Sequence, residues 1–326
     1  MRRASLWFVA RRILQVAPVV IAIGAMNFLL LQMAPGDAAD VLAGQMGHAT
    51  PEFVEQLRRE FGLDRPLHER FFIYLGKLAV FDLGRSHLQQ LPVLDLILDR
   101  LPATLILMVT AIALAIFIGI VLGVAAARRQ GRWADGLISV TALIVYATPA
   151  FWLGLMLIVL FSIKLDLLPS GGIMEIGAGK TGLMLAIDIT RHLILPATTL
   201  GLFYVAIYTR LMRASMLEVY TLDFITTARA KGLSEPRIAW THAFRNALLP
   251  VVTLAGVQLG HLLGGSILVE TVFAWPGLGR LVFDALLQRD LNLLLGILFV
   301  SSIVVVAASL AVDLVYGLLD PRIVHK

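Results

Sequence analysis

Six long runs without Asp, Glu, Lys or Arg constrain the fold of this chain most strongly. A helix that crosses the hydrocarbon of a bilayer needs roughly 20 apolar residues. Five runs exceed that length, and the fourth reaches it if its flanking arginines extend toward the interface. Continuous apolar runs do not fit the alternating pattern of a membrane barrel. We therefore predict an all-α polytopic membrane protein with six transmembrane helices, in the runs Ile13–Gly36, Leu101–Ala127, Gly136–Ile163, Leu193–Thr209, Asn246–Val269 and Leu291–Val312.

The charged residues sort by side of the membrane when the N-terminus is placed in the cytoplasm. The segments that then lie inside hold 15 basic and 6 acidic residues, and those outside hold 12 basic and 16 acidic residues. Basic residues concentrate in short cytoplasmic loops. We therefore expect both termini, and the polar stretch Asp223–Pro250, in the cytoplasm. The net charge of +5 reports this topology, and we do not expect nucleic acid as a partner.

The composition supports the membrane class. Of the 326 residues, 59% are hydrophobic and 15% are charged, whereas about 25% are charged in soluble domains. The chain has no cysteine, which excludes disulfides and thiolate chemistry. The first run is too long for a cleavable signal, and no small-residue cleavage site follows it, so we expect a retained anchor.

The chain divides unevenly along its length. We expect residues 1–94 to form an N-terminal transmembrane helix with an exterior helical segment. Residues 95–320 are expected to form a five-helix transmembrane domain with a cytoplasmic loop at 214–246. In the exterior segment, Thr50-Pro51-Glu52 predicts a helix start, Gly62 predicts its end, and Pro66–Lys77 predicts a second helix. This segment either caps the outer membrane face or docks a soluble partner.

Small and polar residues inside the runs predict close helix packing or a pore. Small residues at four-residue spacing let backbones approach closely, within the chain or at a seam with a second subunit. A polar residue in a span marks a pore or an interhelical hydrogen bond. The small residues are Gly119, Gly123 and Ala127, and Gly256, Gly260 and Gly264; the polar residues are Gln258 and His261. The prolines expected to bend their helices are Pro18, Pro149 and Pro196.

The stretch Asp223–Pro250 predicts two short helices joined at a glycine. Asp223 is placed to cap the first helix, and Gly232 to end it, because glycine tolerates the left-handed conformation. Ser234 is placed to cap the second helix, with Glu235 in its first turn. The apolar side of that helix holds Ile238, Ala239, Trp240, Ala243 and Phe244. Such a basic hairpin either docks a soluble partner or lies on the lipid surface.

Several segments resemble one family of membrane proteins. They are LLLQMAPGDAAD at 29–40, ARAKGLS and HAFRNAL within 223–250, ETVFAWPGLGRLVFDALLQRD at 270–290 and VDLVYGLLDPRI at 312–323. They resemble ABC importer permeases of the dipeptide/oligopeptide/nickel branch. The general loop motif is EAA, three residues, then Gly. Gly232 takes the glycine position and Ala228 matches, whereas Thr226 and Thr227 replace the first two residues. Pro250 comes later than in the general pattern, which favours this branch.

The resemblance implies a type I ABC importer permease fold in the bacterial inner membrane. As partners it implies a second homologous permease, two ABC ATPase subunits and an exterior solute-binding protein, beside membrane lipid. The loop would transmit movement from the ATPase subunits. The residues that the resemblance and the local pattern assign to this coupling loop are Asp223, Thr227, Ala228, Arg229, Ala230, Lys231, Gly232, Ser234, Glu235, His242, Arg245 and Asn246.

Motifs for chemistry in the chain itself are weak. Gly177–Thr181 reads GAGKT, but a full phosphate loop requires a glycine where Met174 stands. We therefore predict that the chain is not an enzyme and that partner ATPase subunits bind ATP and Mg. The isolated His242 and His261 predict no metal site. The acids near the outer mouth are interpreted as solvated, or as contacts for a substrate or receptor; they are Glu270, Asp284 and Asp290.

The favoured function is a permease subunit of an ATP-driven importer for di- or oligopeptides or similar small solutes. Nickel, glutathione and opines are alternative substrates within the same family. An ion-coupled secondary carrier would need ionisable residues inside the spans, and the spans contain almost none away from their ends. A membrane enzyme should be active without partners, and no catalytic arrangement is recognisable.

Overall fold

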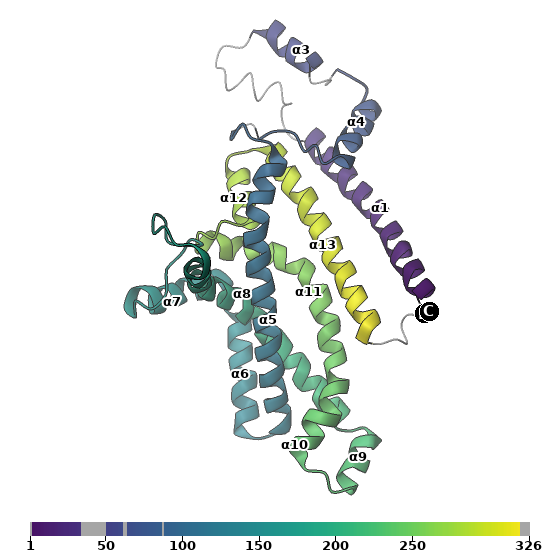
Figure 1. Cartoon of the computed structure of the whole chain (residues 1–326), viewed down its shortest axis with the longest axis vertical. Coiled ribbons are helices and arrows are strands. Elements are labelled where there is room, and N and C mark those ends of the chain that lie inside the picture. Colours follow the sequence, from purple (N-terminus) through teal and green to yellow (C-terminus); the bar gives the residue numbers. More distant parts are fainter. Residues whose placement is uncertain (1, 34–49, 61–63, 87, 320–326) are drawn as a thin grey trace. The chain divides into compact units, whose positions relative to one another are not determined.

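The computed structural model describes residues 2–33, 50–60, 64–86 and 88–319 (Figure 1). In these ranges the elements are helices, beside one isolated bridge between Arg85 and Pro92, which confirms the all-α prediction. The α-helices are α1 (Arg2–Met33), α3 (Pro51–Glu60), α4 (Leu67–Ala79), α5 (Val93–Arg128), α6 (Trp133–Ala147), α7 (Ala150–Leu157), α8 (Gly182–Val219), α9 (Asp223–Ala230), α10 (Glu235–Arg237), α11 (Phe244–Val272), α12 (Leu278–Leu287) and α13 (Leu291–Leu319), and the π-helices are η1 (Ile158–Lys164) and η2 (Ile238–Ala243).

The chain forms two compact units, and each is described by itself. The first comprises residues 1–98, 285–310 and 314–326, and the second comprises residues 99–284 and 311–313. The first unit therefore holds α1, α3, α4 and most of α13. The second holds most of α5, the elements from α6 to α11 and most of α12. The domain boundary expected after residue 94 stays a prediction.

In the first unit, α1 packs on α4 and α13. The amide of Asn27 donates to the carbonyl of Leu295 at 3.2 Å, and the ring centroids of Phe28 and Phe71 lie 5.3 Å apart. The predicted start of the exterior helix is confirmed, because the backbone N–H of Phe53 donates to the Thr50 hydroxyl at 3.4 Å. Its predicted end, Gly62, and the 34–40 part of the LLLQMAPGDAAD segment lie outside the described residues.

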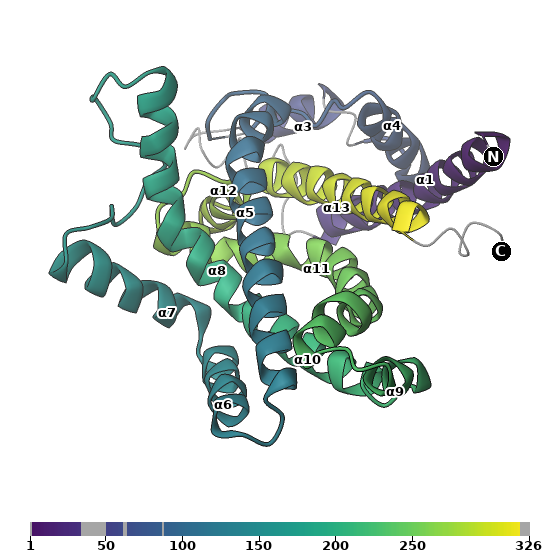
Figure 2. The same cartoon turned by 60° about the horizontal axis from the view of Figure 1, so that its bottom comes forward.

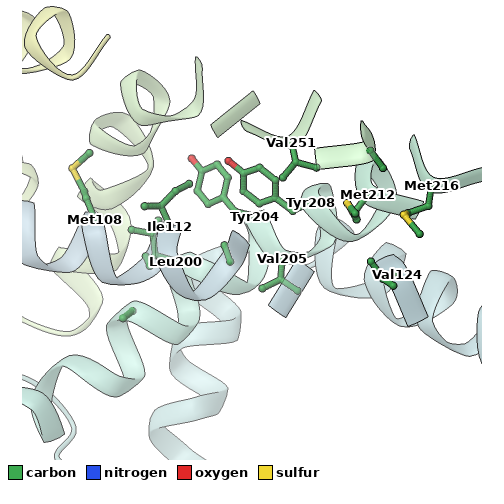
Figure 3. Close-up of a cluster of buried hydrophobic side chains, with 14 of the residues drawn as sticks. Met108, Ile112, Val124, Leu200, Tyr204, Val205, Tyr208, Met212, Met216 and Val251 are labelled. Atoms are coloured by element: carbon green, nitrogen blue, oxygen red, sulfur yellow. The ribbon is translucent and has the colours of Figure 1, made fainter. Parts of the chain in front are cut away.

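In the second unit, α5 and α8 approach each other closely at two glycines. A Cβ added at Gly119 would lie 2.5 Å from the Cβ of Tyr208, and one at Gly123 would lie 2.6 Å from the Cβ of Met212. Ala127, the third member of that row, is buried. The first small-residue row therefore packs within the chain, which is one of the two alternatives that the sequence left open. Figure 3 shows the apolar side chains around Tyr208 that this close approach brings together.

The membrane-spanning prediction is confirmed for long apolar helices and corrected for one run. Among the described residues, three helices are long and apolar enough to cross a membrane: α5, α8 and Leu291–Leu310 of α13. The third run, Gly136–Ile163, is not one straight span, because α6 and the α7–η1 segment meet at 103°. Thr148 is extended there, as expected before Pro149. The count of six spans and the cytoplasmic placement of the termini stay predictions.

The other two prolines lie inside uninterrupted helices. Pro18 lies within α1 and Pro196 within α8. Tertiary packing and neighbouring groups can compensate for the backbone hydrogen bond that a proline removes from a membrane helix. The fourth run is also longer than predicted, because α8 extends from Gly182 to Val219.

An ion pair fixes the start of α6 on α8. The guanidinium of Arg213 donates to the two carboxylate oxygens of Asp135 at 2.6 and 2.8 Å. Asp135 also accepts from the backbone N–H of Gly131 at 3.1 Å, and its side chain is nearly buried. A two-point guanidinium–carboxylate pair adds geometric specificity to its energy. This pair therefore holds the last third of α8, from which the polar loop departs.

Candidate functional site

The polar loop after α8 is anchored by the buried face of α9. Ile225 and Ala228, three residues apart, are buried and belong to the main apolar cluster of the second unit. Residues at this spacing share one face of a helix. The intervening and following residues Thr226, Thr227 and Arg229 are exposed. Two buried side chains therefore anchor α9, and its other side chains are exposed to solvent.

The glycine elbow is confirmed. Gly232 has φ +76°, in the left-handed region, and a Cβ there would meet nothing within 4 Å. Conformation, rather than space, therefore favours glycine at this position. The N–H of Lys231 donates to the carbonyl of Thr227 at 3.0 Å, and that of Gly232 donates to the carbonyl of Arg229 at 2.9 Å. These bonds close the C-terminus of α9.

The two predicted side-chain caps are wrong. Leu222, not Asp223, is the capping residue of α9, and Asp223 is the first helical residue. A carboxylate in the first turn still interacts favourably with the helix dipole. Ser234 has the extended backbone of a capping residue for α10, but its side chain makes no capping hydrogen bond. Both helices therefore begin without a side-chain cap.

The second predicted short helix is not separate. α10 continues directly into η2 and then into α11, so helical backbone runs from Glu235 to Val272. Neither glycine nor a further proline interrupts the chain between Arg237 and Asn246, and a π-helical stretch keeps the backbone hydrogen-bonded. The far side of the elbow is thus the first part of the long helix α11. Figures 1 and 2 show α9 beside α10 at the start of that helix.

One ion pair bridges the elbow. The Arg229 guanidinium donates to Glu235 at 2.8 Å and lies 5.8 Å from the ring centroid of Tyr220. The hydrogen bond from Arg229 lowers the pKa of the Glu235 carboxyl. Both side chains are substantially exposed, 44% and 62%, so solvent screens the pair and it adds little stability. Its main effect is to orient α9 against α10.

The predicted loop residues separate into a buried minority and an exposed majority. Ala228 is buried and His242 is half-buried, and the carbonyl of His242 accepts from the Asn246 amide at 3.0 Å. The exposed members are Asp223, Thr227, Arg229, Ala230, Lys231, Gly232, Ser234, Glu235, Arg245 and Asn246. The structure thus brings the sites from 223 to 235 together in one compact elbow. The last two lie further along, on α11.

Three aromatic residues extend this surface. Phe224 and Trp240 are exposed at 41% and 45%, and Tyr220 stacks near Arg229. Sequence reasoning placed Trp240 on the apolar side with Ile238 and Ala239, but only the latter two are buried. Phe224 and Tyr220 were not predicted. Helical periodicity carries a signal for Phe224, because it is adjacent to the inward Ile225 and therefore off the inward face.

The predicted pore and packing residues of the fifth run lie in α11, and they differ in burial. Gly256 is buried and Gln258 is half-buried. Gly264 is exposed, and a Cβ there would meet nothing within 4 Å, so it does not pack closely on a described part of this chain. Gly260 and His261 are helical, but their side chains lie outside the described residues. A pore role for these residues stays a prediction.

The outer acids are not all solvated, which corrects the expectation. Glu270 is completely buried. Its carboxylate accepts from the Thr104 hydroxyl at 2.8 Å and from the backbone N–H of Arg280, in the first turn of α12, at 3.0 Å. A carboxylate at a helix N-terminus satisfies free N–H groups and the helix dipole. Glu270 is therefore a tertiary cap for α12.

The turn between α11 and α12 fits tightly around that carboxylate. A Cβ added at Gly277 would overlap the carboxylate of Glu270. The indole N–H of the buried Trp275 donates to the carbonyl of Ala103 at 2.9 Å, and the N–H of Leu278 donates to the Thr104 hydroxyl at 2.7 Å. The turn is thus fixed on α5.

The other two acids differ from Glu270 and from each other. Asp290 is buried and caps α13, because it accepts from the N–H of Leu293 at 3.1 Å and from the Ser86 hydroxyl at 2.5 Å. Asp284 is partly exposed and lies 4.0 Å from the guanidinium of Arg280. Only Asp284 therefore resembles the solvated acid that was expected.

The GAGKT segment does not form a phosphate cradle. The Lys180 ammonium donates to Glu175 at 2.6 Å and to Asp188 at 2.9 Å. These hydrogen bonds raise the pKa of Lys180. In a phosphate loop the lysine must be free to reach phosphate oxygens, whereas here two carboxylates occupy it. Among the described residues, no group of three or more His, Cys, Asp or Glu side chains is placed to hold a metal ion.

Comparisons with known proteins agree over nearly the whole chain. Residues 119–325 match the family described as binding-protein-dependent transport system inner membrane component, and residues 5–108 match its N-terminal family. The dipeptide transport system permease protein DppB of Escherichia coli (strain K12) is 41% identical over 98% of this chain and 99% of its own length. The di/tripeptide transport system permease protein DppB of Pseudomonas aeruginosa is 39% identical with the same coverage.

The fold is similar to that of a solved importer. The inward-facing MetNI methionine ABC transporter matches with a TM-score of 0.56 and 19% identity, over 70% of this chain and 97% of the matched chain. At this identity the likeness shows the fold. Together with the family match, it confirms the predicted importer permease fold and the multi-pass inner-membrane location. ATP hydrolysis then resides in separate subunits, and an importer of this kind also needs a binding protein. The chain belongs to the family of binding-protein-dependent transport system inner membrane components, as a permease subunit of an ABC importer.

Proposed function

We propose that this permease imports di- or oligopeptides. The observation that carries the proposal is the near-complete coverage of two relatives whose names state dipeptide and di/tripeptide transport, at 41% and 39% identity. The similarity extends through both the predicted exterior segment and the membrane helices. It therefore includes the surfaces that a substrate and its binding protein would contact. A peptide class is therefore favoured over nickel, glutathione or opines.

We further propose that the elbow from Asp223 to Glu235 is the contact for an ATPase subunit. Its two helices meet at the left-handed Gly232, its inner face is anchored by Ile225 and Ala228, and its outer face is exposed. The elbow is continuous with α11 through η2. A movement of the elbow would therefore be transmitted along a long helix rather than absorbed by a linker.

In the assembly we infer, a second homologous permease, two ATPase subunits and an exterior binding protein complete the importer. ATP closes the ATPase pair, and the elbows carry that closure to the membrane helices. A ligand shifts an equilibrium between two conformations only by its differential affinity for them. The elbow must therefore hold its ATPase partner in both conformations.

Reconstitution tests the proposed function. The chain is co-expressed with the ATPase, permease and binding-protein genes that neighbour its own, and the complex is placed in liposomes. We expect ATP-dependent uptake of a radiolabelled dipeptide that needs the binding protein, and none from the chain alone. Uptake of nickel or glutathione without peptide uptake would refute the substrate class. Ion-driven transport by the chain alone would refute the importer mechanism.

A further inference from the structure

A small mixed-polarity cavity lies in the first unit, away from the elbow described above. Its volume is about 160 Å³, and it is formed by α1, α4, the segment after α4 and α13. An engineered protein cavity of about 150 Å³ accommodates benzene. The space is therefore large enough for a small chemical group of a few heavy atoms. Its lining includes Leu31, Tyr74, Lys77, Asp82 and Leu295.

The cavity offers one positive and one negative group. Lys77 and Asp82 both line it, yet they form no ion pair with each other or with any other described residue. The carboxylate of Asp82 accepts one hydrogen bond, from the backbone N–H of Gly84 at 3.1 Å, which leaves acceptor positions on its oxygens. Two opposite charges beside one cavity, not paired with each other, match a ligand that carries both charges.

The cavity lies at the level where membrane helices end. Leu31 is in the last turn of α1 and Leu295 is in the second turn of α13. Helix ends of apolar spans meet the headgroup region of a bilayer, and tyrosine, here Tyr74, favours that level. The last two turns of α1 also carry exposed apolar side chains, Leu29, Leu30 and Met33. Lipid acyl chains cover such side chains in a bilayer, so the acyl chains of a lipid whose headgroup enters the cavity can lie along the end of α1.

We propose that this cavity binds the headgroup of a zwitterionic phospholipid with a phosphate and a primary ammonium group. Lys77 pairs with the phosphate and Asp82 pairs with the ammonium. The apolar wall of Leu31 and Leu295 meets the first carbons of the lipid. The bound lipid thereby links α1, α4 and α13 of the first unit.

Native mass spectrometry of the full-length chain in detergent tests the proposal. Phosphatidylethanolamine is compared with phosphatidylglycerol, which has the phosphate without the ammonium. We expect phosphatidylethanolamine to bind about tenfold more tightly to the unmodified chain, which is the effect of losing one favourable charged contact. Asp82→Asn should remove this preference. Lys77→Gln should weaken both lipids about tenfold.

Glu69→Gln is the matched control, because Glu69 is an exposed charge on the same helix that does not line the cavity. It should bind both lipids as the unmodified chain does. Free phosphoethanolamine and dialanine carry the two charges without acyl chains, and neither should displace the lipid. Equal binding of the two lipids to the unmodified chain, or a preference that survives Asp82→Asn, would overturn the proposal. Displacement by dialanine would assign the cavity to a soluble zwitterion instead.

Discussion

The elbow at Gly232 and the turn between α11 and α12 lie at the two ends of the continuous helical segment Glu235–Val272, and they are built in opposite ways. In the elbow, the charged Arg229 and Glu235 are exposed and bond to each other across a left-handed glycine with open space around it. In the α11–α12 turn, the Glu270 side chain is fully buried and Gly277 has no room for a side chain. The same residue types thus serve two purposes.

The difference indicates which of the two regions can rearrange, the elbow or the α11–α12 turn. An exposed ion pair contributes little and can be exchanged for contacts with a partner. A buried carboxylate with satisfied donors is costly to disturb, because each orphaned donor loses its partner in a dry environment. We therefore interpret the elbow as a surface that is prepared for a partner and the α11–α12 turn as a fixed point.

Replacing Glu270 should have the largest effect on stability. Glu270→Ala leaves the Thr104 hydroxyl and the Arg280 N–H without an acceptor, at a cost of about 3 kcal/mol. The thermal unfolding midpoint of the purified chain should fall by several degrees. Glu218→Ala is the control, since Glu218 is exposed near the C-terminal end of α8. Similar midpoints for the two variants would show that the turn is not a fixed point.

A smaller loss of stability is expected when a side chain is added inside the α11–α12 turn. Gly277→Ala places a methyl group against the Glu270 carboxylate, and overpacking typically costs about 2 kcal/mol. Gly264→Ala, in open space on α11, should be neutral or slightly stabilising, because alanine favours helix more than glycine. The difference between the two unfolding midpoints measures the tightness of the turn. No difference would contradict the packing described.

Charge reversal in the elbow should change coupling and leave stability nearly unchanged. Lys231→Glu alters an exposed side chain, so unfolding should shift by less than about 0.5 kcal/mol. If the elbow contacts an ATPase subunit, peptide uptake per ATP hydrolysed should fall about tenfold, which corresponds to roughly 1.4 kcal/mol of lost interaction. Arg129→Glu, which alters an exposed arginine in the turn between α5 and α6, outside the elbow, is the control. Unimpaired uptake in Lys231→Glu would argue against the contact.

The smallest effect concerns the pH dependence of the elbow. Arg229 lowers the pKa of Glu235 below its ordinary value of 4.5. The stabilising contribution is therefore complete above pH 4.5 and is lost as the pH falls through the lowered pKa. Exposure limits it to a few tenths of a kcal/mol, roughly. Hydrogen exchange of α9 amides should accelerate below pH 4.5 relative to Glu235→Gln, which lacks the titration. An identical pH profile in both proteins would exclude the pair as a local brace.

The sequence predicts the elbow better than the α11–α12 turn, for a physical reason. Gly232 is a local signal, and the left-handed elbow predicted there is confirmed. The burial of Ile225 and Ala228 on one face of α9 was not predicted, although their three-residue spacing is also a local signal. The carboxylate of Glu270 accepts a hydrogen bond from Thr104, which lies 166 positions away along the chain, so no local pattern predicts this contact. The caps expected from Asp223 and Ser234 failed because Asp223 is the first helical residue of α9, not the residue before it, and because the Ser234 side chain makes no capping hydrogen bond. The prediction of a separate second short helix was wrong because η2 joins α10 to α11 without a break.

Cross-linking tests the contact between the elbow and an ATPase subunit most directly. The chain has no cysteine, so a single introduced cysteine is unique within it. Ala230→Cys places the thiol on the exposed side of α9, and Ile176→Cys places one at a site that is 96% exposed in the predicted exterior loop. In membranes that contain the assembled importer, Ala230→Cys should cross-link to an ATPase subunit and Ile176→Cys should not. Cross-linking of Ile176→Cys to the ATPase, with none from Ala230→Cys, would contradict the account.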